Sequence, residues 1–277
     1  MGTTVTEGYF LKFGGCFWAV KGCHHPEGYA IAVPRKCGDV KVKKLSESVE
    51  LVRRKFPELM RFDPVVNREV PMVPLKYAEI LDPFEAEVKD RRARELIDLV
   101  GGKIGITGSM LYDDKYNDLD FVSFDLDHYF KLKELRERGL TWPLRAYNRE
   151  EVEGISEYCF SSFKTSRVLE GVFEGIPYTF KIVQCVNEGE VVKETDVQGW
   201  FEIVKAERPF TIPAIYEVQG PFKALMKSYR TRFTELREGL RLLIKAPAQL
   251  RKGQNTWEIN VDWGEVIECS PKAQGAG

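Results

Sequence analysis

The sequence predicts a mixed α/β (α+β) protein made of three units. Residues 1–85 show the pattern of short strands, residues 86–199 alternate helices with strands, and residues 200–277 return to short strands. This order is typical of a central mixed sheet with helices, flanked by a β-rich N-terminal domain and a small β-barrel-like C-terminal domain. A chain of 277 residues that is 43% hydrophobic is long and apolar enough to build several cores.

The N-terminal domain is expected to hold a small sheet and one helix. Strands are expected over residues 8–20, 28–34 and 40–45. The stretch 21–28 contains glycine and proline and is expected to be a loop. A helix is expected over 46–56, because serines stand at its start and apolar residues follow at helical spacing. Prolines then mark a connecting region up to residue 83.

The central domain is expected to alternate helices and strands. Helices are expected over 87–100, 128–138 and 149–163, and strands over 104–106 and 118–124. Gly101-Gly102 should end the first helix. Glu174-Gly175 should form a tight turn between two further strands.

The most informative feature is a Gly-Ser bend followed by two aspartates. Gly108-Ser109 follows a short apolar strand, and Asp118 and Asp120 lie on the next strand, where residues two apart share a face. Backbone amides and a hydroxyl at such a bend suit a phosphate group. Two adjacent carboxylates repel each other and suit a divalent cation such as Mg²⁺. The combination predicts phosphoryl or nucleotidyl transfer, although an ordinary turn beside an exposed strand would show the same residues.

This motif resembles the signature of the DNA polymerase beta-like nucleotidyltransferase superfamily, and the wider segments 107–111 and 117–122 resemble an uncharacterised archaeal branch of it. The resemblance implies a nucleotidyltransferase-like mixed sheet. It also implies that Gly108 and Ser109 hold nucleotide phosphates, while Asp118 and Asp120 are catalytic and bind Mg²⁺ or Mn²⁺. The expected substrate is a nucleoside triphosphate, whose nucleoside monophosphate moves to RNA, a protein or a small molecule.

The chain departs from the family pattern at the third metal-binding carboxylate. On the strand where it is expected, Thr179 and Lys181 take its place. Lys181, together with Lys164 and Arg167, is a candidate contact for the nucleotide phosphates, although the last two would equally suit a solvated surface. The missing carboxylate also leaves open a catalytically silent nucleotidyltransferase fold that binds RNA or a protein.

The C-terminal domain is expected to hold strands over 200–206, 215–218, 240–247 and 256–269, followed by a disordered end over 272–277. Cations and aromatic residues alternate between them, and four side chains are candidate nucleic-acid contacts: Lys227, Tyr229, Arg230 and Arg232. An ordinary loop whose aromatic side chains pack inward is the competing interpretation.

Charge and composition restrict the class of protein. The 41 basic and 42 acidic residues give a net charge of −1, which excludes a globally basic nucleic-acid clamp but leaves room for local patches. The sequence contains no apolar run long enough to span a membrane, and its first six residues lack the features of a signal peptide. A cytoplasmic protein without membrane contact is therefore expected.

The six cysteines are scattered without a CxxC pair: Cys16, Cys23, Cys37, Cys159, Cys185 and Cys269. Cys23-His24-His25 and Cys37 are possible zinc ligands by residue type. Three consecutive residues cannot easily direct all their side chains to one ion, so buried thiols are favoured over zinc. Disulfides are not expected in a cytosolic protein unless it comes from a hyperthermophile.

Overall fold

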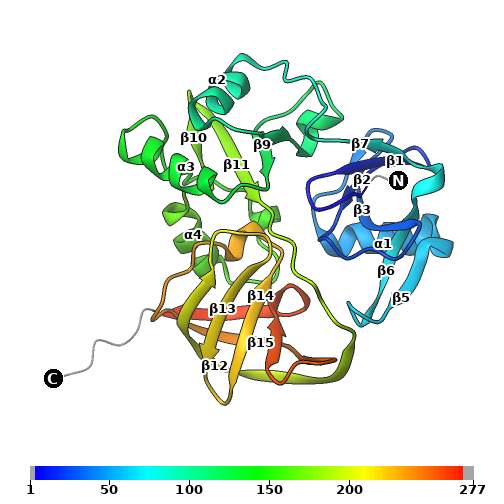
Figure 1. Cartoon of the computed structure of the whole chain (residues 1–277), viewed down its shortest axis with the longest axis vertical. Helices are drawn as coiled ribbons and strands as arrows, with labels where there is room; N and C mark the ends of the chain where they lie inside the picture. Colours follow the sequence, from blue (N-terminus) through cyan, green and yellow to red (C-terminus); the bar gives the residue numbers. More distant parts are fainter. Residues whose placement is uncertain (1–3, 271–277) are drawn as a thin grey trace. The chain divides into compact units, whose positions relative to one another are not determined.

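The computed structural model describes residues 4–270 and divides the chain into two compact units (Figure 1). The first unit comprises Met1–Trp142 and Val168–Asn187, and the second comprises Pro143–Arg167 and Glu188–Gly277. The expected mixed α+β class is confirmed, with three sheets and many more strands than helices. None of the described helices is both long and apolar enough to cross a membrane. The segment 272–277, expected to be disordered, lies outside the described residues.

The N-terminal sheet of the first unit has the order β5-β6-β3-β2-β1-β7, with β4 paired to β3. Its strands are β1 (Phe10–Phe13), β2 (Cys16–Val20), β3 (Tyr29–Cys37), β4 (Val40–Lys41), β5 (Met60–Asp63), β6 (Arg68–Pro74) and β7 (Glu79–Leu81). Helix α1 (Leu45–Lys55) packs its buried Leu51 and Val52 into the same core as Trp18. The expected loop and helix are confirmed, whereas the proline-rich connecting region in fact supplies three strands of this sheet.

The second sheet of the first unit has the order β10-β11-β9-β8. Its strands are β8 (Gly105–Ile106), β9 (Leu119–Ser123), β10 (Glu170–Phe173) and β11 (Ile176–Ile182), and its helices are α2 (Arg91–Val100) and α3 (Asp127–Glu137). Strands β9 and β11 run parallel and the other two pairs run antiparallel, so the sheet is mixed as expected. Asp90 caps α2 by accepting from two backbone amides, and Gly101 ends this helix as expected.

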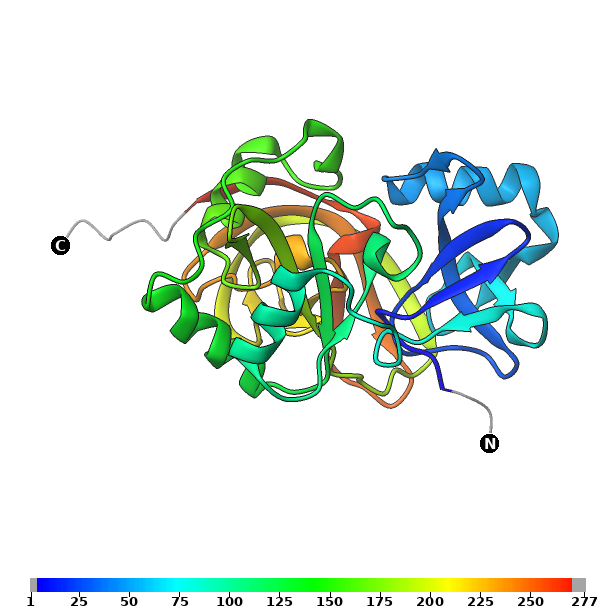
Figure 2. The ribbon, with the colours of Figure 1, turned by 90° about the horizontal axis from the view of Figure 1, so that it is seen from above.

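The second unit is a closed barrel (Figures 1 and 2). Its strands are β12 (Val191–Arg208), β13 (Ala214–Gln219), β14 (Lys223–Ser228), β15 (Arg241–Arg251), β16 (Trp257–Asn260) and β17 (Glu265–Ser270). The order is β12-β13-β14-β16-β15-β17, and an additional pairing of β12 with β15 closes the ring. The expected C-terminal barrel is present, and β12 begins it nine residues before the expected boundary at residue 200.

Helix α4 (Glu157–Ser166) belongs to the barrel, although residues 143–167 were expected in the central domain. Its Phe160 and Phe163 pack into the barrel core beside Phe201 and Tyr216. The helix also begins later than expected, because Gly154 has a positive φ and Ser156 caps the helix through the amide of Cys159. Apolar packing determines to which unit the helix belongs, and capping determines where the helix begins. Helical periodicity in the sequence reports neither.

All six cysteines form disulfides, which corrects the expectation of free thiols. The pairs are Cys16–Cys37, Cys23–Cys185 and Cys159–Cys269. Cys23 and Cys37 therefore cannot act as thiolate ligands of zinc in this structure, because each forms a disulfide with another cysteine. Such bonds are typical of oxidising compartments and of intracellular proteins from hyperthermophiles.

Reduction of Cys159–Cys269 is expected to destabilise the barrel by about 2–4 kcal/mol, because the bond closes a long loop in the unfolded chain. The two cysteines are 110 residues apart in sequence, and both are buried. Denaturant unfolding of the oxidised protein and of a Cys159→Ala/Cys269→Ala variant measures the loss. Equal midpoints for the two proteins would contradict the prediction.

Candidate active site

The Gly-Ser bend and the aspartate strand meet directly in the first unit. The amide of Thr107 donates to the carbonyl of Asp120 at 2.9 Å, which aligns the bend with strand β9. Gly108 has φ +60°, and a Cβ placed on it would lie 1.9 Å from Oδ2 of Asp120. Only glycine therefore fits here, because a side chain would occupy the space of the carboxylate. The bend and the carboxylate form one site.

The two aspartates stand at the start of β9. Leu119 and Phe121 are fully buried, and the ring of Phe121 stacks on Phe180 at 4.6 Å, so the alternate residue Asp120 lies on the opposite face, as expected. Burial, followed by repulsion from Asp118, raises the pKa of Asp120 well above its usual range. Because the charge of Asp118 contributes to this rise, a cation bound between the two carboxylates would relieve part of it.

The Gly-Ser bend forms the first two residues of a short 3-10 helix, η3 (Gly108–Leu111). The amide of Asp120 donates to Sδ of Met110 at 3.2 Å. The carbonyl of Ser109 accepts from the amide of Asp113 at 2.8 Å, which keeps Ser109 at the rim of the site, half-buried. Ser109 and Gly108 thus lie where the sequence predicts phosphate contacts, beside the carboxylate pair.

A third carboxylate lies on the same face of the sheet, on a strand that the sequence did not indicate. Asp120 is in register with Thr179 on β11, and Thr179 is in register with Glu170 on β10. Glu170 is buried, and its negative charge contributes to the raised pKa of Asp120. The turn Glu174-Gly175, with both φ angles positive, fixes this register, as expected for a two-residue hairpin.

Within residues 4–270, no three His, Cys, Asp or Glu side chains converge as a ready-made metal cage. Mg²⁺ commonly binds through one or two carboxylates and completes its shell with water and substrate phosphates. The oxygen donors of Asp118 and Asp120 fit that mode of binding.

Lys181 lies on the same face as Asp120 but is held by a buried acid. Its Nζ is 2.7 Å from Oε1 of Glu7, and Nζ of Lys21 is 3.8 Å from the same oxygen. Burial alone would raise the pKa of Glu7, but the two ammonium groups more than offset it and lower that pKa to about 2. Lys181, expected to contact the phosphates, is therefore paired with Glu7, but the cluster of Glu7, Lys21 and Lys181 keeps a net positive charge that partly offsets the raised pKa of Asp120.

Replacement of Glu7 by glutamine is expected to cost about 3 kcal/mol of stability at neutral pH. Since the pKa of Glu7 falls from 4.5 to about 2 on folding, its stabilisation is complete above pH 4.5 and is lost as the pH falls toward 2. Denaturant unfolding at pH 7 and at pH 2.5 measures the free energy of unfolding of both proteins. The difference between the two proteins should be smaller at pH 2.5. A difference independent of pH would contradict this role.

Lys164 and Arg167 are the other expected phosphate contacts. Both belong to the second unit, whereas Asp118 and Asp120 belong to the first. Both are buried. Lys164 lies 3.7 Å from a carboxylate oxygen of Glu151, and Nε of Arg167 donates to the carbonyl of Phe163 at 3.2 Å. Both cations also lie against the ring of Phe160. Their contacts support helix α4 in the barrel and give no evidence of a nucleotide site.

The expected nucleic-acid contacts are likewise turned inward. Lys227 is 2% exposed and pairs with Glu188 and Glu258, while the hydroxyl of Tyr229 also donates to Glu188. Burial is the main cause of the raised pKa of Tyr229. Lys227 lies in strand β14 and not in a loop, and both the buried Lys227 and the half-buried Tyr229 contact acids of the second unit.

Arg230 and Arg232 are held in the same way. Nη1 of Arg230 lies 3.5 Å from a carboxylate oxygen of Glu153, and Arg232 donates to the carbonyl of Glu153. Burial, followed by repulsion from Arg230, lowers the pKa of Arg232 to about 10. Both guanidinium groups are thus committed to contacts inside the second unit.

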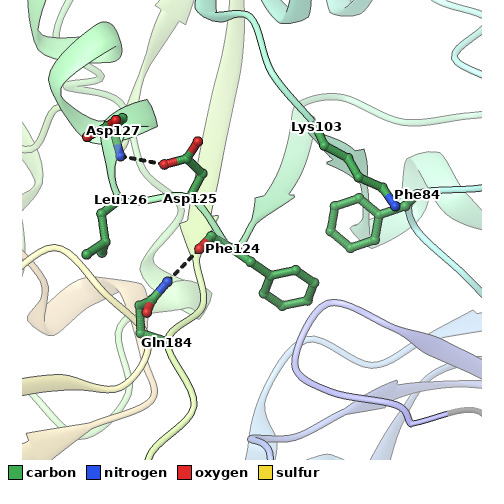
Figure 3. Close-up of a pocket in the computed structure, with 7 residues that line it drawn as sticks. All are labelled: Phe84, Lys103, Phe124, Asp125, Leu126, Asp127 and Gln184. Carbon is green, nitrogen blue, oxygen red and sulfur yellow. Dashed lines mark hydrogen bonds between the residues drawn. The ribbon is translucent and has the colours of Figure 1, made fainter.

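A separate pocket of about 500 Å³ opens at the carboxyl ends of the parallel strands β9 and β11 (Figure 3). Phe84 and Phe124 face each other at 5.1 Å between ring centroids, with Nζ of Lys103 over the ring of Phe84. The remaining lining residues are Asp125, Leu126, Asp127 and Gln184. Neither Asp118 nor Asp120 lines this pocket.

Comparisons with protein-family models, with curated proteins and with solved structures gave no match. The chemistry available at the site is that of a glycine-serine bend, an adjacent aspartate pair and a third carboxylate on the same face of the sheet.

Proposed function

We propose that the protein is a metal-dependent nucleotidyltransferase, which transfers a nucleoside monophosphate from a nucleoside triphosphate to an acceptor. The observation that carries the proposal is the direct contact between Gly108 and Asp120, because it brings a phosphate-binding bend and a metal-binding carboxylate within reach of one substrate. The mixed sheet, with the bend after β8 and the aspartates on β9, also supports a nucleotidyltransferase-like arrangement.

In this function Asp118 and Asp120 hold Mg²⁺ or Mn²⁺, and Gly108 and Ser109 bind the triphosphate. The metal, when bound, neutralises charge on the phosphates and on the departing pyrophosphate. The acceptor oxygen attacks the α-phosphorus, a new P–O bond forms, and the bond to pyrophosphate breaks. Glu170 is the candidate base for the acceptor proton, because it is a carboxylate on the same face as Asp120.

The test is transfer of label from each α-labelled nucleoside triphosphate to RNA, to protein and to small molecules, with Mg²⁺ or Mn²⁺. Metal-dependent labelling of one acceptor class, abolished by a chelator, is the expected result. A protein that binds no triphosphate in the presence of either metal would exclude the proposed function.

A catalytically silent fold that holds RNA is the alternative, and the strand order of the barrel favours it. The ring β12-β13-β14-β16-β15, closed by β12 with β15 and with β14 parallel to β16, is the order of oligonucleotide-binding barrels. The charges on β12, β13 and β14 oppose it, since Lys205 and Lys223 there are paired with Glu207 and Glu217. Retention of RNA without label transfer would support this alternative.

A further inference from the structure

The N-terminal sheet carries an arginine toward the carboxylate site. Strands β2 and β3 pair with Phe17 opposite Lys36 and Trp18 opposite Pro34, so Arg35 is the extra residue of a β-bulge. A bulge redirects a side chain and places two consecutive residues on one side of the strand. Arg35 and Lys36 are both half-buried, after five consecutive buried residues of the same strand.

The neighbours of Arg35 fix the bulge against the loop that leads to the aspartates. Nζ of Lys36 is 2.9 Å from Oδ2 of Asp113, and Nζ of Lys41 is 3.3 Å from the same oxygen. The ring of Tyr112, the residue before Asp113, stacks on Phe17 at 4.8 Å. These contacts join the N-terminal sheet to the segment between the Gly-Ser bend and Asp118.

The guanidinium of Arg35 is oriented by its own sheet. Its Nη1 donates to the carbonyl of Lys43 at 2.6 Å and to that of Val42 at 3.5 Å, which fixes one edge of the planar group. Burial raises the pKa of Tyr112 to about 12, and the positive charge of Arg35 partly offsets that rise. Arg35 therefore lies close to Tyr112, which belongs to the segment that leads from the Gly-Ser bend to Asp118.

We propose that Arg35 binds the terminal phosphates of the nucleoside triphosphate, so that the N-terminal sheet is part of the nucleotide site. The inference rests on the proposed function and adds to it a preference for triphosphates over monophosphates. A planar guanidinium suits this task because it can donate two parallel hydrogen bonds to one phosphate group. Lys181 is less suited, because its ammonium is a single point charge that already pairs with Glu7 at 2.7 Å.

The test compares Arg35→Gln and Arg35→Lys with the wild type by calorimetric titration of the four nucleoside triphosphates, their monophosphates and inorganic triphosphate, all with Mg²⁺. We expect Arg35→Gln to weaken triphosphate binding about ten- to hundredfold and to leave monophosphate binding unchanged. Arg35→Lys should give an intermediate loss, because it keeps the charge and loses the paired geometry.

Arg61→Gln is the matched control, since Arg61 lies on the same sheet with its guanidinium over the ring of Tyr29. It should bind all the probes like the wild type. The ratio of triphosphate to monophosphate affinity does not depend on the folded fraction, so it separates phosphate binding from a structural role. If Arg35→Gln keeps the wild-type ratio of triphosphate to monophosphate affinity, the role of Arg35 is overturned while the proposed function stands. Absence of triphosphate binding in the wild type would overturn the proposed function and this inference with it.

Discussion

Replacement of Asp120 by asparagine is expected to reduce nucleotidyl transfer by at least about 10³-fold, because the amide removes a negative metal ligand without changing the size of the side chain. The same change is expected to raise the melting temperature. Burial and Asp118 raise the pKa of Asp120 on folding, so above pH 3.8 the folded state must either take up a proton or hold the charge at Asp120, and both cost free energy of unfolding. Asparagine removes that cost.

The measurement pairs label transfer with thermal unfolding at pH 7, and Mn²⁺ titration reports on the metal site. Asp114→Asn is the matched control, because Asp114 lies in the loop that leads to β9 and forms an exposed pair with Lys89 at 3.5 Å. It should change neither activity nor metal affinity appreciably. A stable but fully active Asp120→Asn protein would remove Asp120 from the catalytic site.

The core of this site could be predicted because it is local in sequence. Gly108 and Asp120 are separated by a short 3-10 helix and one loop, and the alternation of Leu119, Asp120 and Phe121 reports directly which side chain faces outward. Short-range geometry therefore determines where the bend and the carboxylate lie relative to each other.

The third carboxylate could not be located with the same reasoning. Glu170 reaches the face of Asp120 only through two pairings, of β10 with β11 and of β11 with β9. The turn at Glu174-Gly175 fixes the first pairing and was recognisable in the sequence. The second is a parallel pairing between strands about sixty residues apart in sequence, and no local signal specifies its register.

The contributions of the N-terminal sheet were missed for a related reason. Glu7 meets Lys181 across 174 positions, and the hydroxyl of Thr107 donates to the carbonyl of Gly8 across 99. Composition predicted a β-rich domain there but not the surface against which it packs. A bulge at Arg35 is also hidden in the sequence, because a single extra residue leaves the apolar pattern of β3 nearly unchanged.

The misassigned cations in the barrel and the unexpected disulfides have the same origin. Lys227 and Tyr229 looked suited to nucleic acid because the acids that neutralise them, Glu188 and Glu258, lie far away in sequence. Cys23 and Cys185 are 162 residues apart. Residue type and spacing indicate which contacts a side chain can make. Which contacts it makes depends on residues that are distant in sequence and close in the fold.

Replacement of Gly108 by alanine is expected to lower transfer by at least about 10²-fold, since small displacements of reacting groups cost that much. The new Cβ would lie 1.9 Å from Oδ2 of Asp120, and real atoms cannot approach so closely. Either the carboxylate or the bend must move, which separates the metal ligand from the phosphate site. The loss should appear in activity and in metal affinity together.

Gly139→Ala is the control that isolates this contact. Gly139 has φ +71°, close to the +60° of Gly108, and a Cβ on it would meet nothing within 4 Å. Both variants therefore carry about 1–2 kcal/mol of backbone strain, and only Gly108→Ala also displaces Asp120. Similar losses of stability with a large difference in activity are expected. Equal activity in the two variants would mean that the close approach of bend and carboxylate has no part in the chemistry, because strain alone would then account for both.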